Sequence, residues 1–189
     1  MNRARWAGVL TLAVSLLVVG GVRSAVPENI PFEYRVHPDT MGVARIDEAT
    51  IEQISLEAAS SLRSAREFSD EVFTAAPDTV LVVGRFRFVA HGNLFSVRTQ
   101  IRSNDGYTFD ALPLNGFTQP PLVHVGMSVT TSIIYEVPLD KLDGVIGIHG
   151  VRPDGLQSVA PLVVYPLPDG LERDPGEVVV PEDVLEPVW

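Results

Sequence analysis

The sequence predicts an all-β fold, an antiparallel β-sandwich, because long segments alternate apolar and polar residues and are separated by tight turns. In the clearest segment, residues 79 to 90, one face carries Val80, Val82, Phe86 and Phe88. Two turns follow, at residues 91 to 93 (HGN) and 104 to 106 (NDG), built from residue types that tolerate positive φ. Such a meander cannot bury its own apolar face, so we expect a second layer of strands.

The N-terminal residues are predicted to be a targeting segment. Arg3 and Arg5 precede an uncharged run of seventeen residues, 6 to 22. A secretory apolar region is about 7 to 15 residues long and a membrane span about 17 to 25. We expect residues 1 to 25 to be a transmembrane signal anchor that leaves the C-terminal domain outside the cell membrane. A cleaved signal and a secreted protein are the alternative.

Residues 26 to 42 contain three prolines and no periodicity, so they are predicted to be an extracytoplasmic linker. The sandwich domain is then expected over residues 43 to 168, beginning with strands at 43 to 47 and 50 to 58. Residues 50 to 66 also fit a helix, because Ile51, Ile54, Ala58 and Leu62 share one helical face. The residue pattern leaves helix and strand open for this segment.

Six further strands are predicted from alternating or β-branched runs bounded by turn residues. Pro138 ends the longest Thr-rich run, and residues 152 to 155 (RPDG) provide a turn. Gly84 inside a strand indicates a bulge or a close backbone contact. The six expected strands are 79 to 90, 94 to 103, 107 to 112, 127 to 137, 145 to 151 and 159 to 165.

The C-terminal segment, residues 169 to 189, differs from the rest in composition. It carries seven acidic residues, one arginine and three prolines, so it is predicted to be a disordered tail. A solvated tail is the simpler interpretation, and a docking peptide that adds to a sheet edge is the alternative. Its apolar residues, the candidate contacts for a partner, are Val178, Val179, Val180 and Trp189.

The charge and the residue inventory exclude several classes of function. The chain has 189 residues, a net charge of −10 and a single lysine, which argues against a nucleic-acid surface. It has no cysteine, so disulfides and thiolate metal sites are excluded. The four histidines lack the spacing of a zinc helix, and no nucleophile elbow is present. We therefore expect no catalytic residues, no metal site and no cofactor.

Four short segments carry a resemblance to a known family. They are residues 78 to 88 (DTVLVVGRFRF), 101 to 109 (IRSNDGYTF), 125 to 129 (VGMSV) and 135 to 138 (YEVP). Together they resemble the immunoglobulin-like domain of unknown function found on bacterial lipoproteins and membrane-anchored envelope proteins. Val125 stands where that family usually has proline. The resemblance implies a non-catalytic sandwich, favours a strand over residues 50 to 58, and carries over no functional residue.

Two classes of function follow from these expectations. The first is a non-enzymatic envelope domain, held in the membrane by residues 6 to 22, that contacts another protein through a sheet face or an unpaired strand edge. The second is a secreted or anchored binding module for a small ligand or a cell-wall glycan. Its candidate stacking residues are Tyr107, Phe109 and Phe117, beside Pro120 and Pro121.

Overall fold

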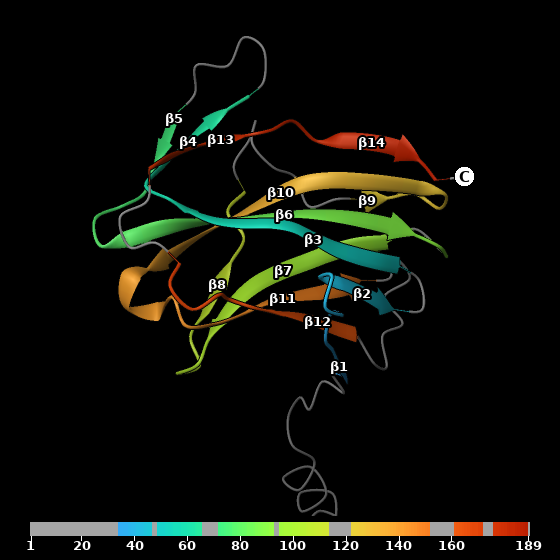
Figure 1. The fold of residues 1–189 in the computed structure, drawn as a ribbon, viewed down its shortest axis with the longest axis horizontal. Helices are drawn as coiled ribbons and strands as arrows, with labels where there is room; N and C mark the ends of the chain where they lie inside the picture. The colour runs from blue at the N-terminus through green and yellow to red at the C-terminus, as the bar shows by residue number, and fades with distance from the viewer. Residues whose placement is uncertain are drawn as a thin grey trace, which may run out of the picture. The chain divides into compact units, whose positions relative to one another are not determined.

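The computed structural model describes residues 34–46, 49–65, 72–92, 95–113, 122–151, 161–171 and 176–188. These residues belong to one compact unit, Glu33–Trp189. The unit is an all-β sandwich whose strands form three sheets, here named A, B and C (Figure 1). The predicted signal anchor lies outside the described residues. Within the described ranges, no helix has the length and apolar character needed to cross a membrane.

Sheet A has the order β1-β12-β11-β7-β8, and β9 also pairs with β7. Sheet B has the order β14-β10-β6-β3-β2, and the small sheet C has the order β13-β4-β5. The strands of sheet A are β1 (Tyr34–Val36), β7 (Phe95–Ser103), β8 (Thr108–Asp110), β9 (Leu122–Val123), β11 (Gly144–Val151) and β12 (Pro161–Pro166). Those of sheet B are β2 (Val43–Ile46), β3 (Ala49–Ala59), β6 (Thr79–Ala90), β10 (Met127–Pro138) and β14 (Val184–Pro187). Those of sheet C are β4 (Ser61–Ser64), β5 (Val72–Thr74) and β13 (Glu177–Val180). A short 3-10 helix, Leu139–Lys141, follows β10.

All eight expected strands are present, as β2, β3, β6, β7, β8, β10, β11 and β12. Residues 50 to 66, for which the sequence left helix and strand open, form strands in their described part, namely β3 and β4. Two strand pairs are parallel rather than antiparallel: β1 with β12, and β13 with β4. Each of these pairs joins segments far apart in the sequence, so no local hairpin signal could reveal it.

The main core lies between sheets A and B. The predicted apolar face of β6 is fully buried there, since Val80, Val82, Phe86 and Phe88 all have 0% exposure. The Phe86 ring packs at a tilt against Tyr165 of β12, with centroids 5.4 Å apart. The Tyr165 hydroxyl donates a 2.8 Å hydrogen bond to the Ile51 carbonyl, which ties sheet A to β3.

A second, smaller core lies on the other side of sheet B, beneath sheet C. Leu81 and Val83 of β6 are buried in it, together with Leu62 of β4 and Val180 of β13. One half of β6 is therefore covered on both faces, which explains its run of consecutive apolar residues. The other half carries Arg85 and Arg87 on the outer face, as a half-buried strand should.

Gly84 makes the close contact that its place in a strand indicated. A Cβ at this position would lie 2.5 Å from the Phe86 ring, so only glycine lets that ring fold back over the strand. A bulge is also present, on the neighbouring strand β3, where the register shifts between Gln53 and Ser55. The bulge leaves Ile54 without a partner on β6 and brings Leu56 opposite Gly84.

Two of the expected domain boundaries are wrong. The described part of the expected linker 26 to 42, residues 34 to 42, is not only a linker, because β1 pairs with β12 and the Asp39 carboxylate accepts hydrogen bonds from the Met41 and Val43 amides. The expectation of a disordered tail over residues 169 to 189 is also wrong, because β13 and β14 pair with β4 and β10. Of the described tail prolines, Pro181 follows β13 and Pro187 ends the edge strand β14, so neither interrupts a ladder. The acidic side chains of β13 and β14, Glu177 and Glu186, lie exposed.

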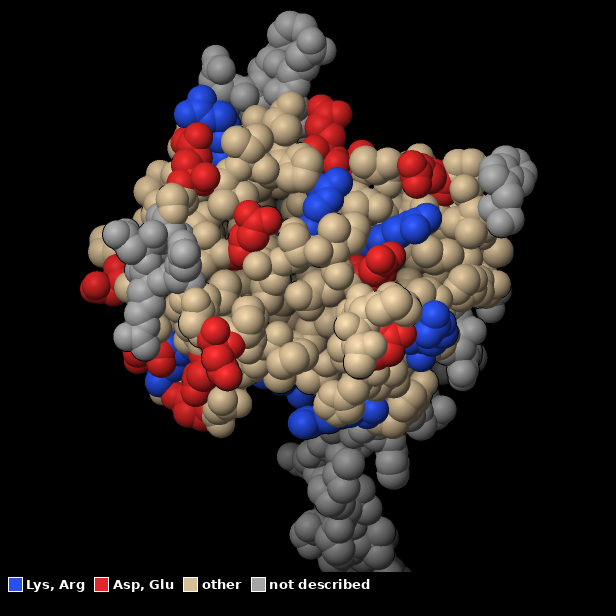
Figure 2. Space-filling view, viewed as in Figure 1, with Lys and Arg blue, Asp and Glu red and all other residues tan. Residues whose placement is uncertain are grey.

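Charged side chains of both signs are mixed on the face seen in Figure 2. In the described chain, ion pairs join Arg45 with Asp39 and Lys141 with Asp105, among others. Despite the net charge of −10, this face shows no large patch of a single sign.

Candidate functional site

The most distinctive surface of the described chain is an open edge of sheet B. β3 pairs with β6 along its length, but β2 covers its other side only from Ala49 to Glu52. One more hydrogen bond lies on this side of β3, from the Gln53 amide to the Gly42 carbonyl at 3.0 Å. Among the described residues, no strand pairs with this side of β3 beyond Gln53. The remainder of β3 is therefore an edge strand.

The cause of the open edge is the short length of β2. The chain enters β2 through a tight turn in which the Asp39 carboxylate accepts the Met41 and Val43 amides at 2.9 and 3.0 Å. Gly42 adopts φ +76°, which favours glycine. The hydrogen bonds from these two amides hold the pKa of Asp39 below its usual range, and the nearby Arg45 lowers it further. The turn fixes where β2 begins and so where coverage of β3 ends.

Leu56 and Ala58 direct their backbone polar groups out of this edge. The Leu139 amide donates to the Asp78 carbonyl, so the backbone polar groups of Asp78 point toward β10. Successive residues of a strand point these groups to opposite sides, so those of Thr79, Leu81 and Val83 point toward β3. The partners of Leu81 and Val83 on β3 are Ala59 and Glu57, which leaves Leu56 and Ala58 pointing the other way. The Ser60 amide confirms this direction, because it donates to the Gly176 carbonyl at 3.0 Å on the open side.

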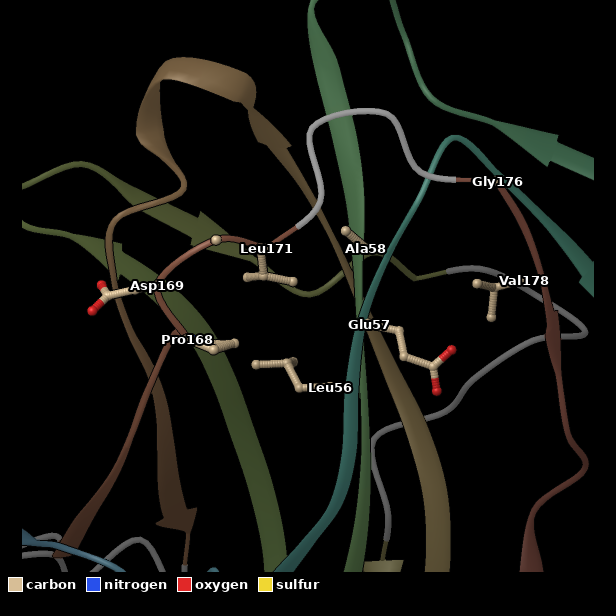
Figure 3. A pocket seen from close by; sticks show the side chains of 9 residues that line it. Leu56, Glu57, Ala58, Pro168, Asp169, Leu171, Gly176 and Val178 are labelled. Carbon is tan, nitrogen blue, oxygen red and sulfur yellow. The ribbon is translucent and has the colours of Figure 1, made fainter.

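Two segments form walls beside the exposed edge and make it a groove, here named the edge groove. One wall is residues 168–171, which follow β12, and the other is formed by Gly176 and Val178. The groove has a volume of about 450 Å³ and its base is formed by Leu56, Glu57 and Ala58. Figure 3 shows Leu56, Pro168 and Leu171 together on one side of β3, with Glu57 and Val178 on the other.

The two sides of the edge groove differ in chemistry. Leu56, Ala58 and Leu171 are half-buried and pack against the main core, so this side is apolar. Glu57 is exposed and forms no ion pair with any described residue. The Asp169 carboxylate points away from Leu56 in Figure 3 and lies at the rim. Among the described residues that line the groove there is no lysine or arginine, and the charged ones, Glu57 and Asp169, are acidic.

The wall that contains Val178 is held by a charged contact between β4 and β13. Arg63 donates two hydrogen bonds to the Glu177 carboxylate, at 3.0 and 3.1 Å. This contact holds the pKa of Glu177 below its usual range. Below it, Val180 is buried at 2% exposure and its carbonyl accepts the Ala65 amide at 2.9 Å. Strand β13 is thus fixed at both ends.

The residues predicted to contact a partner lie in different environments in the structure. Val178 lines the edge groove, Val179 is 55% exposed, and Val180 is buried in the second core. Trp189 lies outside the described residues. Residues 178 to 180 pair in parallel with β4 of the same chain, and their contact with a partner protein stays a prediction. Sequence reasoning missed Leu56, Glu57 and Ala58, because nothing local shows that β2 stops short of them.

The candidate ligand-stacking residues do not gather into a site within the described ranges. Tyr107 is 59% exposed, and the Lys141 ammonium lies 4.8 Å from its ring centroid. Phe109 packs against the main core, while Phe117, Pro120 and Pro121 fall outside the described residues. His91 contacts the Thr50 hydroxyl at 2.7 Å, and His149 lies near Gln100 on sheet A. In the part of the chain that is described, no three His, Asp or Glu side chains are placed to hold a metal ion.

Neither the family models nor the curated proteins give a match to this sequence. Among solved structures, the chain is similar to an uncharacterised β-sandwich protein from Clostridium difficile, with 11% identity and a TM-score of 0.47 over 70% of this chain and 95% of the other. It is also similar to a candidate lipoprotein from Bacillus subtilis, with 8% identity and a TM-score of 0.48. That match covers 70% of this chain and 41% of the other protein.

Proposed function

We propose that this protein is a non-enzymatic, membrane-anchored immunoglobulin-like domain of the bacterial cell envelope that contacts another protein through the edge groove. One observation carries the proposal: between two walls, β3 presents backbone groups at Leu56 and Ala58 that no described residue pairs with. An unpaired strand edge is a template for another chain, because it offers a row of hydrogen bonds that only an extended backbone can satisfy.

The order of the strands supports the immunoglobulin-like assignment. In sheet A, β12-β11-β7 corresponds to strands G, F and C of that fold, with β8 beside strand C. In sheet B, β3-β6-β10 corresponds to strands A, B and E. The chain order of these strands agrees with this correspondence. Domains of this architecture commonly present binding surfaces, and their fold alone assigns no chemistry.

Anchoring is proposed from the sequence alone. The apolar run of residues 6 to 22 behind two arginines supports a membrane segment with the sandwich on the outer side. The absence from the sequence of a nucleophile elbow and of a zinc-helix spacing supports a role other than catalysis. An anchored domain that binds by strand addition needs only a stable sandwich and an accessible edge.

Crosslinking in intact cells tests the proposal. A photo-reactive residue replaces Ile54, which is 49% exposed at the bulge beside the edge groove, and a control protein carries it at the exposed Thr108 of β8. We expect a protein adduct from position 54 that position 108 does not give.

A proline variant connects that adduct to the strand edge. Ala58→Pro removes an N–H that points away from β6, so the ladder inside sheet B is kept while the edge is blocked. Thr74→Pro is the matched control, because the Thr74 N–H faces away from β4 on the far edge of sheet C. The adduct should disappear in the first variant and persist in the second. Adducts insensitive to Ala58→Pro, or recovery of a small ligand or glycan with no protein adduct, would overturn the proposal.

A further inference from the structure

We infer that the edge groove selects a short extended peptide segment with apolar side chains at alternate positions and a lysine or arginine between them. This inference rests on the proposed function, and it adds the length, the side-chain pattern and the charge of the partner segment. Four features of the groove carry it: its closed ends, its backbone groups, its apolar side and the exposed carboxylate of Glu57.

The ends of the groove limit the length of the guest segment. At one end the Gly42 carbonyl already accepts the Gln53 amide, and at the other the Gly176 carbonyl accepts the Ser60 amide. Between these two bonds, no strand of the described chain pairs with this side of β3 at residues 54 to 59. At about 3.4 Å per residue, this gap spans roughly 20 Å. A guest strand of about five residues fills it without displacing either bond.

The backbone of β3 dictates an extended conformation. Leu56 and Ala58 are two residues apart, and each offers one N–H and one C=O in the same direction. A neighbouring strand satisfies all four groups, whereas a helix cannot match a spacing of two residues. The guest therefore presents successive side chains to opposite sides of β3.

One of those sides accepts apolar groups. Leu56, Ala58 and Leu171 are half-buried and continuous with the main core between sheets A and B. Alternate guest residues that point to this side extend the core and remove these side chains from water. Burial of their methyl and methylene groups favours binding, so valine, isoleucine or leucine fits best.

The other side accepts a cation. Glu57 projects there beside Val178, is exposed, and has no described ion partner. Residues directly opposite on neighbouring strands have Cβ atoms about 5 Å apart, within reach of a lysine or arginine side chain. A second copy of this chain is disfavoured as the partner, because the net charge is −10 and pairing two such edges would bring the Glu57 carboxylates together.

Peptide binding to the full chain in detergent micelles tests the inference. The probes are two fluorescein-labelled seven-residue peptides, one alternating valine with lysine and the other alternating valine with glutamate, measured by anisotropy at low salt. Exposed ion pairs change affinity by about threefold each, so exchanging attraction for repulsion at Glu57 should give roughly a tenfold preference for the lysine peptide. The preference should shrink as salt is added.

Two variants separate this inference from the proposed function. Glu57→Lys should remove or invert the preference, with an unchanged melting temperature because Glu57 is exposed. Ala58→Pro should weaken binding of both peptides, and Thr74→Pro should weaken neither. Binding that responds to Ala58→Pro but shows no charge preference, or a preference that survives Glu57→Lys, would overturn the inference and leave the proposed function standing. No peptide binding, together with cellular adducts insensitive to Ala58→Pro, would overturn both.

Discussion

Two buried tyrosines in the main core differ in whether their hydroxyl group forms a hydrogen bond. Tyr165 donates to the Ile51 carbonyl at 2.8 Å, whereas the Tyr135 hydroxyl has no hydrogen-bond partner within the described residues. Burial raises the pKa of both phenols. For Tyr135, the neighbouring Thr99 hydroxyl offsets this only in part, since no hydrogen bond of normal geometry joins the two. The two residues therefore make a matched pair for measuring one buried bond.

We predict that Tyr165→Phe lowers the free energy of unfolding by about 1 kcal/mol, because it removes a buried hydrogen bond to the Ile51 carbonyl. Tyr135→Phe should leave it unchanged or raise it by up to about 1 kcal/mol, because it removes a buried polar group that has no partner. Urea unfolding of both variants measures the difference. Equal losses for the two variants would contradict the prediction.

At the scale of elements, the C-terminal strand β13 is an integral part of the fold. Val180 is 2% exposed in the second core, and its neighbour Val179 is 55% exposed on the same strand. Val180→Ala should cost roughly 2 kcal/mol of unfolding free energy, as two buried carbons are lost and a cavity remains. Val179→Ala should stay within about 0.5 kcal/mol, as for surface changes in general. Thermal and urea unfolding provide the comparison, and a neutral Val180→Ala would mean that β13 is dispensable.

The contact of Arg63 with Glu177 makes the position of β13 sensitive to acid. The folded state holds the pKa of Glu177 below its usual value, so the carboxylate contributes stability above that value and loses the contribution as the pH falls through the folded pKa. Glu177→Gln should therefore lower the urea midpoint at pH 7 and have a smaller effect at pH 3. Asp183→Asn is the control, since Asp183 is exposed and forms no described ion pair. An effect of Glu177→Gln that is equal at both pH values would contradict this reading.

The elements that the sequence predicts well are the long ones. β6 and β10 have twelve residues each, and the alternation of apolar and polar residues along them indicates which side faces the core. The missed strands β1, β4, β5, β9, β13 and β14 have two to four residues each, too few to show a period. Their strand conformation comes from pairing with distant partners. The acidic, proline-containing tail showed this most clearly, because composition predicts disorder and pairing overrides it.

The candidate site was harder to predict than the fold, for a related reason. The edge groove depends on where β2 stops, on a bulge at Ile54, and on walls contributed by residues 168–171 and 176–178. None of these features is a motif, and Glu57 has no neighbour in sequence that marks it. The general expectation of an unpaired edge was available from the β-rich sequence. Its location required the registers of the neighbouring strands.

At the scale of the whole molecule, three sheets enclose two cores, and sheet B is shared by both. The C-terminal segment passes from the edge of sheet C to the edge of sheet B, so it covers two strand edges that would otherwise be open. Figure 1 shows this path along β13 and β14. Beyond Gln53, β3 has no such cover from any described strand.

The last prediction concerns how the whole protein is held in place. Residues 6 to 22 are long enough to span a bilayer, and Arg23 occupies the position where a cleavage site at Ala25 would need a small residue. We therefore expect a C-terminally tagged protein to remain at full length in the membrane fraction and to resist extraction with alkaline carbonate. Leu16→Arg combined with Leu17→Arg should release it from that fraction, because each arginine at the centre of a span costs about 3 kcal/mol. A soluble, N-terminally trimmed product in the medium would instead establish the secreted alternative. The edge groove would then bind its partner away from the membrane.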